Sequence, residues 1–332
     1  MHCYFHNDQD GIASGYLVKK ICNMYGIGYN IMDFTMASYD NPFADHDENE
    51  DVIFLVDLSF TMKTLERLER ICKAAKKVIW VDHHRSSFEL IANENFHTPS
   101  NLFGFLSETG CGALNTYRLF RSLSNDLDVN TPNRLFGEVI KGKRTDPFIM
   151  IMPDLELKER FRIPSWLSFI DDYDRWIKKL PNTDAFHYGM EAAGINMILP
   201  NKDGYNEFNP IWEELFRKDD CLKYIDAGKA IIKYTEEQYK RELSSCFEVA
   251  YMDTIILCKN GRIGSANFGE RYYNYDACSV FYYDGNVNLW KHSIYSHDKS
   301  NFDCSKFAET YGGGGHFHAA GFSMRTPLWL NV

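Results

Sequence analysis

Carboxylate and imidazole side chains follow three apolar segments of this sequence, each at the point where the segment ends. The segments are residues 1–5, 52–56 and 78–81, and the groups that follow them are His6, Asp8, Asp10, Asp57, Asp82, His83 and His84. In an open α/β sheet, ligands bind outside the carboxyl ends of the strands, so these groups are expected to converge on one crevice. Neighbouring carboxylates repel one another and raise each other's pKa values. Divalent cations would offset this repulsion, and the sequence therefore predicts a metal site.

The first of these motifs alternates ligand-type residues along the chain. In an extended segment, His6, Asp8 and Asp10 would all point to one side. A turn with solvated acids is the alternative. A calcium loop is disfavoured because Leu17 stands where the bidentate glutamate is required. The motif alone does not decide between a ligand cluster and a turn.

The other two motifs differ in how strongly they indicate function. Asp57 alone is compatible with a helix N-cap, although Ser59 or Thr61 would serve that role better. The run from Asp82 to His84 is more specific, because three ligand-type groups directly after a buried strand seldom arise for packing alone. A carboxylate beside a metal-binding imidazole would also orient that imidazole.

A fourth acidic motif lies in the apolar segment that begins at Trp166. Asp171 and Asp174 are three residues apart and share a face if this segment is helical. The alternative is a solvated acidic face that pairs with Arg175 and Lys178. By itself this motif is weak evidence for a functional site, and it is included because the metal site needs further ligands.

A glycine-rich segment, residues 312–315, precedes His316 near the end of the sequence. It lacks the Gly-Lys-Ser/Thr ending of a P-loop. Consecutive glycines followed by small residues indicate backbone amides that approach an anion closely at the start of a helix. A flexible loop is the alternative.

The expected elements place these motifs in an α/β fold. Strands are predicted near residues 2–6, 29–36, 52–57 and 78–82, with helices between them, and such units form parallel sheets. We expect a metal-binding catalytic domain over 1–195, with an irregular segment at 130–165 that reads as an insertion. A linker and a long connecting helix, interrupted near Asp219, should occupy 196–248. A smaller α+β domain should follow over 249–332.

Composition limits the class of protein further. The 332 residues include 45% hydrophobic residues, enough for a sizeable core, and carry a net charge of −10, which argues against binding to duplex DNA. The nine cysteines are scattered without a Cys-x-x-Cys pair, which is typical of a reducing compartment. No secretory signal or membrane-spanning run is predicted. We therefore expect a cytoplasmic protein without membrane partners, with a homodimer left open.

Together, these motifs resemble those of the DHH phosphoesterase superfamily, named for its Asp-His-His motif. The motifs occur in the family's order along nearly the whole chain, and the glycine-rich segment resembles the substrate-binding motif of the associated C-terminal DHHA1 domain. The spacing of His6 and Asp8 and the run from Tyr173 to Trp176 resemble the NrnB-like oligoribonuclease (nanoRNase) branch. The resemblance implies an N-terminal parallel-sheet DHH domain and a DHHA1-type α+β domain.

The resemblance also implies a site with two Mn²⁺ ions, with Mg²⁺ or Co²⁺ as substitutes. His6 and Asp8 would hold one ion and Asp10 and His83 the other, with Asp57 as the bridge. Asp174, or less securely Asp171, would complete the coordination shell of the second ion. Asp82 and His84 would orient the ligands or contact the substrate. The substrate-binding residues would be Gly313, Gly314, Gly315, His316, Tyr295 and Ser296. Several relatives have an arginine where this chain has Tyr295, which suggests base stacking in place of a phosphate contact.

The activity implied by the resemblance is metal-dependent exonucleolytic hydrolysis of short oligoribonucleotides to mononucleotides. Two alternatives are also enzymes: a phosphatase of adenosine 3′,5′-bisphosphate and a phosphodiesterase of dinucleotides. An inorganic pyrophosphatase of family II is disfavoured by the motif spacing and by the glycine-rich segment. A nucleotide-sensing module without catalysis is disfavoured because all the expected ligands are present.

Overall fold

The computed structural model describes residues 1–25, 33–37, 50–121, 132–140, 142–152, 163–195, 198–200, 206–262 and 265–330. The chain divides into two compact units, Met1–Ile231 and Ile232–Val332. The division falls inside helix α9 (Leu222–Leu243), within the segment in which the sequence predicts a connecting helix. Each unit is described by itself.

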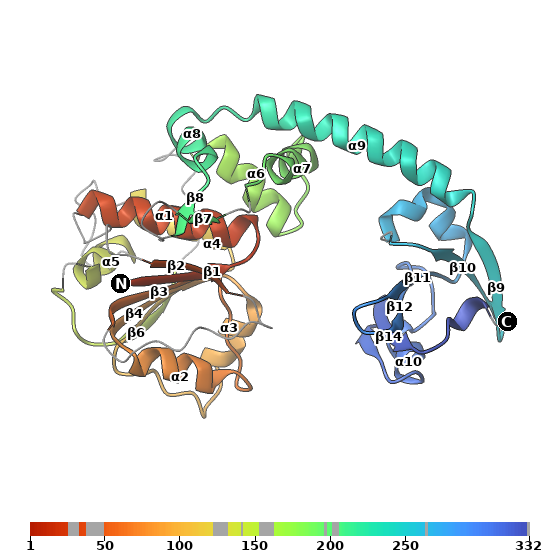
Figure 1. The fold of residues 1–332 in the computed structure, drawn as a ribbon. Helices are drawn as coiled ribbons and strands as arrows, with labels where there is room; N and C mark the ends of the chain where they lie inside the picture. Colours follow the sequence, from red (N-terminus) through yellow and green to blue (C-terminus); the bar gives the residue numbers. More distant parts are fainter. Residues whose placement is uncertain are drawn as a thin grey trace. The chain divides into compact units, whose positions relative to one another are not determined.

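A six-stranded parallel sheet forms the centre of the first unit (Figure 1). Its order is β2-β1-β3-β4-β5-β6, and every neighbouring pair is parallel. The strands are β1 (His2–His6), β2 (Asp33–Ala37), β3 (Glu50–Val56), β4 (Ala75–Asp82), β5 (Leu102–Leu106) and β6 (Phe148–Ile151). The predicted α/β class is confirmed. Residues 29–32 of the second predicted strand lie outside the described residues.

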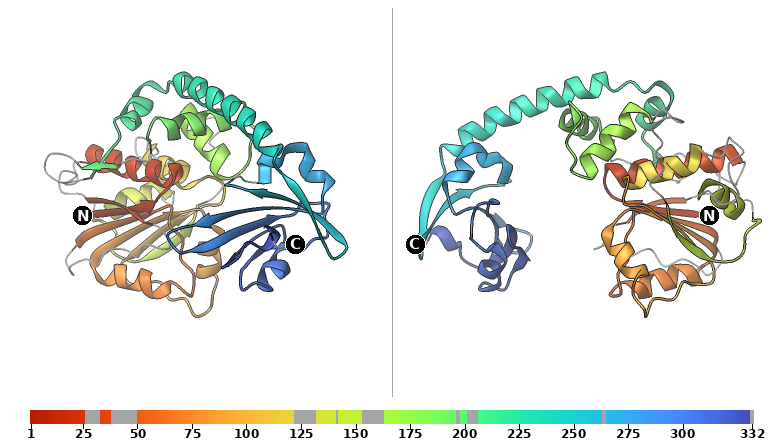
Figure 2. Two further views of the ribbon diagram at one scale, coloured as in Figure 1. Left: turned by 45° about the vertical axis from the view of Figure 1, so that its right-hand side comes forward. Right: turned by 180° about the vertical axis from the view of Figure 1, so that it is seen from behind.

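Helices cover both faces of this sheet (Figure 2). One face carries α1 (Gln9–Tyr25), α4 (Gly112–Arg121) and α5 (Pro132–Ile140), and the other carries α2 (Leu65–Lys73) and α3 (Arg85–Ile91). Strands β3 and β4 have buried side chains on both faces, as expected for a parallel sheet between helix layers. Trp80 is fully buried toward α2, and its indole nitrogen donates to the Leu58 carbonyl at 2.8 Å. This rigid sheet fixes the positions of the residues that follow the strand ends.

The expectation that residues 130–165 form an irregular insertion is wrong for the part of that segment that is described. It contains α5 and β6, and β6 pairs in parallel with β5, with Phe103 opposite Phe148. Phe105 packs edge-on against Phe136 of α5, with ring centroids 5.5 Å apart. The segment therefore extends the sheet. Residues 153–162 lie outside the described residues.

A helical region follows the sheet in the chain. It consists of α6 (Ser165–Asp174), α7 (Thr183–Ala192), the short pair β7 (Ile198–Pro200) and β8 (Asn206–Phe208), and then α8 (Ile211–Lys218) and α9. The predicted interruption of the long helix is confirmed at Asp219, which has a φ of 52°. The Asp219 carboxylate accepts hydrogen bonds from the Ser165 hydroxyl and the Trp166 amide, which fixes the break against the start of α6.

The second unit is built on a mixed six-stranded sheet of order β13-β14-β12-β11-β10-β9. Its elements are β9 (Phe247–Tyr251), β10 (Thr254–Asn260), the 3₁₀ helix η3 (Ser265–Asn274), β11 (Ala277–Asp284), β12 (Leu289–Tyr295), α10 (Cys304–Glu309), β13 (Gly314–His316), β14 (Ala319–Met324) and η4 (Leu328–Leu330). Phe307 of α10 packs on one face and Phe268 of η3 on the other. The predicted α+β domain is therefore present. Among the described residues, no helix of either unit has the length and apolarity to cross a membrane.

Candidate metal centre

Three neighbouring strands of the first unit end in one row of ligand-type residues. Phe5 of β1 lies opposite Val56 of β3, and Val56 lies opposite Val81 of β4. The next residue on each strand is therefore His6, Asp57 or Asp82. The register brings together at one sheet edge the groups that the sequence places at three separate strand ends.

The turn after β1 positions His6 and Asp8. The His6 Nδ1 lies 2.5 Å from the Asp8 Oδ2, and the Asp8 Oδ1 accepts a hydrogen bond from the Gly11 amide at 2.8 Å. The expectation that His6, Asp8 and Asp10 share one side of an extended segment is wrong, because α1 begins at Gln9 and Asp10 lies in its first turn. Gly11 passes so close to His6 that a Cβ atom would lie 2.2 Å from the His6 carbonyl oxygen. The ligands converge through this tight turn.

Asp10 is held by the start of α4, more than one hundred residues further along the chain. Its two carboxylate oxygens accept hydrogen bonds from the amides of Gly112 at 2.7 Å and Ala113 at 2.8 Å. These amides belong to the helix start, where backbone donors are otherwise unsatisfied and a negative charge is favourable. A Cβ atom on Gly112 would lie 2.7 Å from the Asp57 Cβ, so a glycine is required there. Sequence reasoning missed this role of Gly112, although the run from Gly110 to Gly112 signals a close approach.

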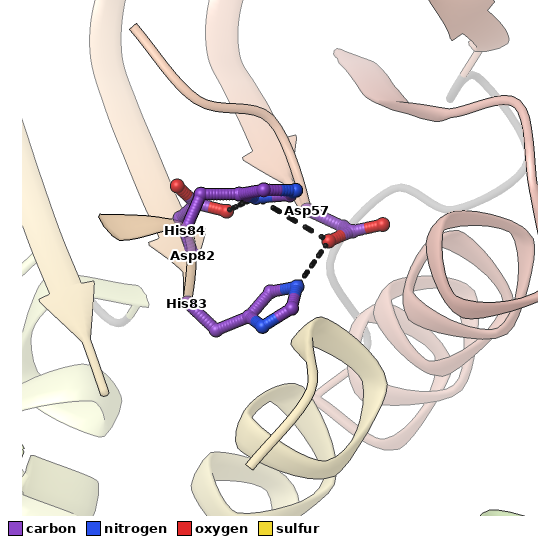
Figure 3. Close-up of side chains that lie close together, drawn as sticks. All are labelled: Asp57, Asp82, His83 and His84. Atoms are coloured by element: carbon purple, nitrogen blue, oxygen red, sulfur yellow. Dashed lines mark hydrogen bonds and ion pairs between the residues drawn. The ribbon is translucent and has the colours of Figure 1, made fainter. Parts of the chain in front are cut away.

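Asp57 lies at the centre of the cluster (Figure 3). It is 1% exposed and has a φ of 56°, a left-handed conformation that aspartate tolerates better than most residues. Figure 3 shows the rings of His83 and His84 turned toward the same Asp57 oxygen, with the nearest nitrogens 3.1 Å and 3.9 Å away. Burial and the charges of Asp10, Asp8 and Asp174 raise the pKa of Asp57 well above its usual value.

Asp82 orients His84 and is itself fully buried. Its Oδ1 lies 2.7 Å from the His84 Nδ1, and its Oδ2 accepts a hydrogen bond from the Ser87 hydroxyl, a partner that the sequence did not signal. Burial opposes the charged form of His84, but the hydrogen bond to Asp82 and the charges of Asp174 and Asp10 outweigh it and raise the pKa of His84 to about 9. The hydrogen bond therefore favours an orienting role for Asp82.

The structure separates the two candidates of the fourth motif. The Asp174 Oδ2 lies 3.6 Å from the His83 Nε2, is buried, and accepts no hydrogen bond from the described residues. Burial and the charges of Asp10 and Asp8 raise the pKa of Asp174 to about 8. Asp171 instead accepts a hydrogen bond from the Cys111 amide at 2.8 Å and pairs with Arg175. Asp171 therefore supports the start of α4, whereas Asp174 points into the cluster.

The donor set fits two divalent cations. Ligand atoms within 4.8 Å of one another form the groups His6–Asp8–Asp57 and Asp10–His83–Asp174, and a third group joins Asp57 to residues 82–84. Asp57 lies in the first group and contacts His83 of the second. The carboxylates of Asp8, Asp10, Asp57 and Asp174 repel one another, and the buried Asp174 oxygen has no hydrogen bond among the described residues, so a bound cation would stabilise the cluster. Oxygen ligands together with imidazole suit Mn²⁺. The ligand sets that the resemblance implies remain a prediction, and the structure brings their side chains close together.

The glycine-rich segment of the second unit differs from the expectation of a helix start. Gly312 has a φ of 74°, and the Gly313 amide donates to the Ala308 carbonyl, so these glycines end α10. Gly314, Gly315 and His316 then form β13, an exposed strand at the sheet edge. A Cβ atom on Gly313 would lie 2.2 Å from the Gly321 carbonyl oxygen, which explains the requirement for glycine. An edge strand still presents backbone amides to an anion.

Two other predicted substrate contacts lie next to this segment. Tyr295 is partly buried at the end of β12, opposite Ala319 of β14. Ser296 is 3% exposed, and its hydroxyl lies 3.0 Å from the His318 Nδ1. Ser296 therefore fixes the β13–β14 hairpin, whereas His316 is exposed.

Comparison with known proteins gives a relative along almost the whole chain. No family model matches. Oligoribonuclease NrnB of Bacillus subtilis is 24% identical over 99% of this chain and 74% of its own length. An uncharacterized protein, R106 of Acanthamoeba polyphaga mimivirus, is 27% identical over 49% of this chain and 37% of its own.

Comparison with solved structures finds matches along most of this chain, all at low sequence identity. A pGpG-specific phosphodiesterase, PggH, from Vibrio has a TM-score of 0.45 and 12% identity, covering 97% of this chain and 92% of its own. RecJ of Thermus thermophilus, solved with Mn²⁺, has a TM-score of 0.44 and 14% identity, covering 97% of this chain and 49% of its own. The motifs, their convergence at one sheet edge and the likeness to NrnB along almost the whole of this chain support an assignment to the DHH phosphoesterase superfamily, with similarity to the NrnB-like branch.

Proposed function

We propose that this protein is a metal-dependent exonuclease that hydrolyses short oligoribonucleotides to mononucleotides. The observation that carries the proposal is the pair of adjoining ligand groups, His6–Asp8–Asp57 and Asp10–His83–Asp174, at the carboxyl edge of the parallel sheet. The name of the relative, oligoribonuclease, supports the substrate class. The net charge of −10 also favours a short substrate, because a long strand needs a basic track along its backbone.

The residues of the site have separable roles in this proposal. When bound, two Mn²⁺ ions would neutralise the scissile phosphate and lower the pKa of a bound water. Asp57 would join the two ligand groups, and the α4 amides would hold Asp10 in place. His84, oriented by its contact with Asp82, would donate a hydrogen bond to a phosphate oxygen.

A substrate panel tests the proposal. Protein stripped with EDTA and reloaded with Mn²⁺ is incubated with a 5′-phosphorylated dinucleotide, a five-mer, a long RNA, adenosine 3′,5′-bisphosphate and pyrophosphate. We expect mononucleotides from the two shortest RNAs, at rates at least about tenfold above the others and only with metal. The His83→Ala variant controls for a contaminating nuclease. If adenosine bisphosphate or the long RNA is hydrolysed faster than the two shortest RNAs, the proposed substrate class is wrong and the preferred substrate takes its place.

The proposal extends to the second unit through His316. The exposed imidazole and the backbone amides of β13 would bind a terminal phosphate or a base of the substrate. His316→Ala should raise KM for a dinucleotide about tenfold, the loss typical of one hydrogen bond to a charged group, and should lower kcat because distant binding energy positions the reacting phosphate. Metal content should stay unchanged.

Steady-state kinetics on dinucleotides and five-mers, with metal analysis, measures this effect. His97→Ala, another exposed histidine that lies in the first unit, is the matched control and should behave as the wild type. Dinucleotide kinetics that are unchanged in His316→Ala would remove the glycine-rich segment from the substrate site.

A further inference from the structure

An exposed tryptophan lies immediately after the last ligand of the metal centre. Trp176 is 73% exposed, whereas Trp80, Trp166 and Trp212 are fully buried. It is two residues from Asp174, so their Cα atoms are at most about 7 Å apart. A large exposed aromatic residue that follows the last acidic residue of the cluster so closely in the chain is a candidate for ligand contact.

The backbone around Trp176 is held in a conformation that bulky residues disfavour. Trp176 has a φ of 55° and Lys178 a φ of 52°, and the left-handed conformation costs roughly 1–2 kcal/mol for such residues. The buried carboxylate of Asp172 holds this turn by accepting hydrogen bonds from the amides of Lys179 and Leu180, both at 3.0 Å. Asp172 also accepts from the Thr183 hydroxyl at the start of α7. Strain that the surrounding structure maintains is typical of functional sites.

The side chains around the indole form an ordered aromatic and cationic group. The Lys178 Nζ lies 4.4 Å from the Trp176 ring centroid and 3.5 Å from that of Tyr173. Tyr173 packs edge-on to Trp176 and stacks on His187, with centroids 3.5 Å apart and an interplanar angle of 6°. These contacts fix the orientation of the indole and leave most of its surface exposed.

The same group is tied to the residues of the metal centre from a second direction. The Gln9 side chain, between Asp8 and Asp10, donates to the His187 carbonyl at 2.9 Å. Burial and the charge of Lys178 lower the pKa of His187 to about 4, while Asp184 and Asp8 act in the opposite direction. His187 is therefore neutral at physiological pH, and its ring serves as a flat support for Tyr173. The hydrogen bond from Gln9 thus joins the aromatic group to the turn that carries Asp8 and Asp10.

We propose that Trp176, supported by Tyr173 and Lys178, stacks on a nucleobase of the substrate next to the scissile phosphate. A base has an aromatic face whatever its identity, and base–aromatic stacking contributes about 1–3 kcal/mol per base. Lys178, which also pairs with Asp184, helps to hold the indole in place beside the substrate. This inference rests on the proposed function and adds a determinant of substrate class: one base is bound beside the metals, without sequence preference.

The test compares Trp176→Ala and Trp176→Phe with the wild type on three dinucleotides. One carries both bases, and each of the other two has an abasic residue in place of one base, at one end or at the other. Trp176→Ala should raise KM for the complete dinucleotide about 10–100-fold with little change in kcat, and Trp176→Phe should restore most of the loss. On the dinucleotide abasic at the stacked end, wild type and Trp176→Ala should have equal KM values. Tyr234→Ala, which removes another highly exposed aromatic ring, is the matched control.

A binding measurement gives a readout that does not depend on turnover. Wild-type tryptophan fluorescence should be quenched by a phosphorothioate dinucleotide in the presence of Ca²⁺, and Trp176→Phe should lose most of the quench because the other described tryptophans are largely buried. Trp176→Gly removes the backbone strain, so its melting temperature should equal or exceed that of the wild type. If Trp176 only packs against another part of the chain, the Trp176→Gly variant should instead melt several degrees below the wild type.

The outcomes separate this inference from the proposed function. If the wild type hydrolyses no oligonucleotide but the quench is present and depends on Trp176, the proposed function fails and the base-binding role stands. Equal KM values for wild type and Trp176→Ala on the complete dinucleotide would overturn the role of Trp176, whatever the preferred substrate. A destabilised Trp176→Gly variant with an unchanged quench would likewise assign the residue to packing.

Discussion

The Asp57→Asn variant should lose phosphoesterase activity by roughly 10³-fold or more, while its metal-free form melts at a higher temperature than the metal-free wild type. Asp57 lies in one ligand group and contacts His83 of the other, so its removal affects both. Asparagine keeps the shape of the side chain and tolerates the φ of 56°. The loss of activity would therefore report the loss of a charged ligand and not a disturbed backbone.

The gain in metal-free stability follows from the charges in the cluster. Burial and four neighbouring carboxylates raise the pKa of Asp57, and similar causes raise the pKa of Asp174 to about 8. A carboxyl group whose pKa is raised on folding contributes stability below its unfolded pKa of about 4, and that stability is lost as the pH rises through the folded pKa. The melting temperature of the metal-free wild type should therefore fall between about pH 4 and pH 8. Asp57→Asn should weaken this dependence.

Calorimetry with and without Mn²⁺, together with metal analysis, measures both effects. In the wild type, Mn²⁺ at one hundred times its dissociation constant should add about 2.7 kcal/mol per site, and Asp57→Asn should lose most of this gain. Asp33→Asn, at the start of β2, is a control outside the metal centre and should show the full metal effect. Near-normal activity of Asp57→Asn with full metal content would exclude a dinuclear site joined by Asp57.

The strand ends could be predicted from the sequence because a buried parallel strand has a simple pattern. Apolar runs such as 78–81 cannot face water on either side, and a polar residue directly after them marks the sheet edge. The positions of Asp57 and Asp82 depend on little else. The structure adds the register, which places them beside His6.

The parts that the sequence did not predict depend on contacts between distant segments. The start of α4 holds Asp10 through the Gly112 and Ala113 amides, and nothing local to Asp10 signals this. Strand β6 is short and only partly buried, so its apolar signal is weak next to the prolines and charges around it. The glycines of 312–315 are compatible with several close backbone approaches, and only the pairing with β14 identifies which one occurs.

Asp171 and Asp174 of the fourth motif also could not be told apart from the sequence. Variants of these two residues give the clearest comparison. They lie one helical turn apart on α6, and residue type does not distinguish them. Asp174→Asn should lose activity at least about 100-fold and should bind one metal ion fewer, because it supplies a buried oxygen to the group with Asp10 and His83. The Asp171→Asn variant should lose activity about tenfold or less and should still bind both metal ions.

The smaller loss in Asp171→Asn should come with a loss of stability, which Asp174→Asn should not show in its metal-free form. Asp171 accepts from the Cys111 amide, next to the amides that hold Asp10, so its removal should destabilise the start of α4 by about 1–2 kcal/mol. Asp174→Asn removes a repelling charge and should leave the metal-free protein as stable as the wild type or more so. Activity, metal stoichiometry and melting temperature of the two variants therefore change in opposite patterns. The reverse pattern would assign the ligand to Asp171 and make Asp174 the support for the helix.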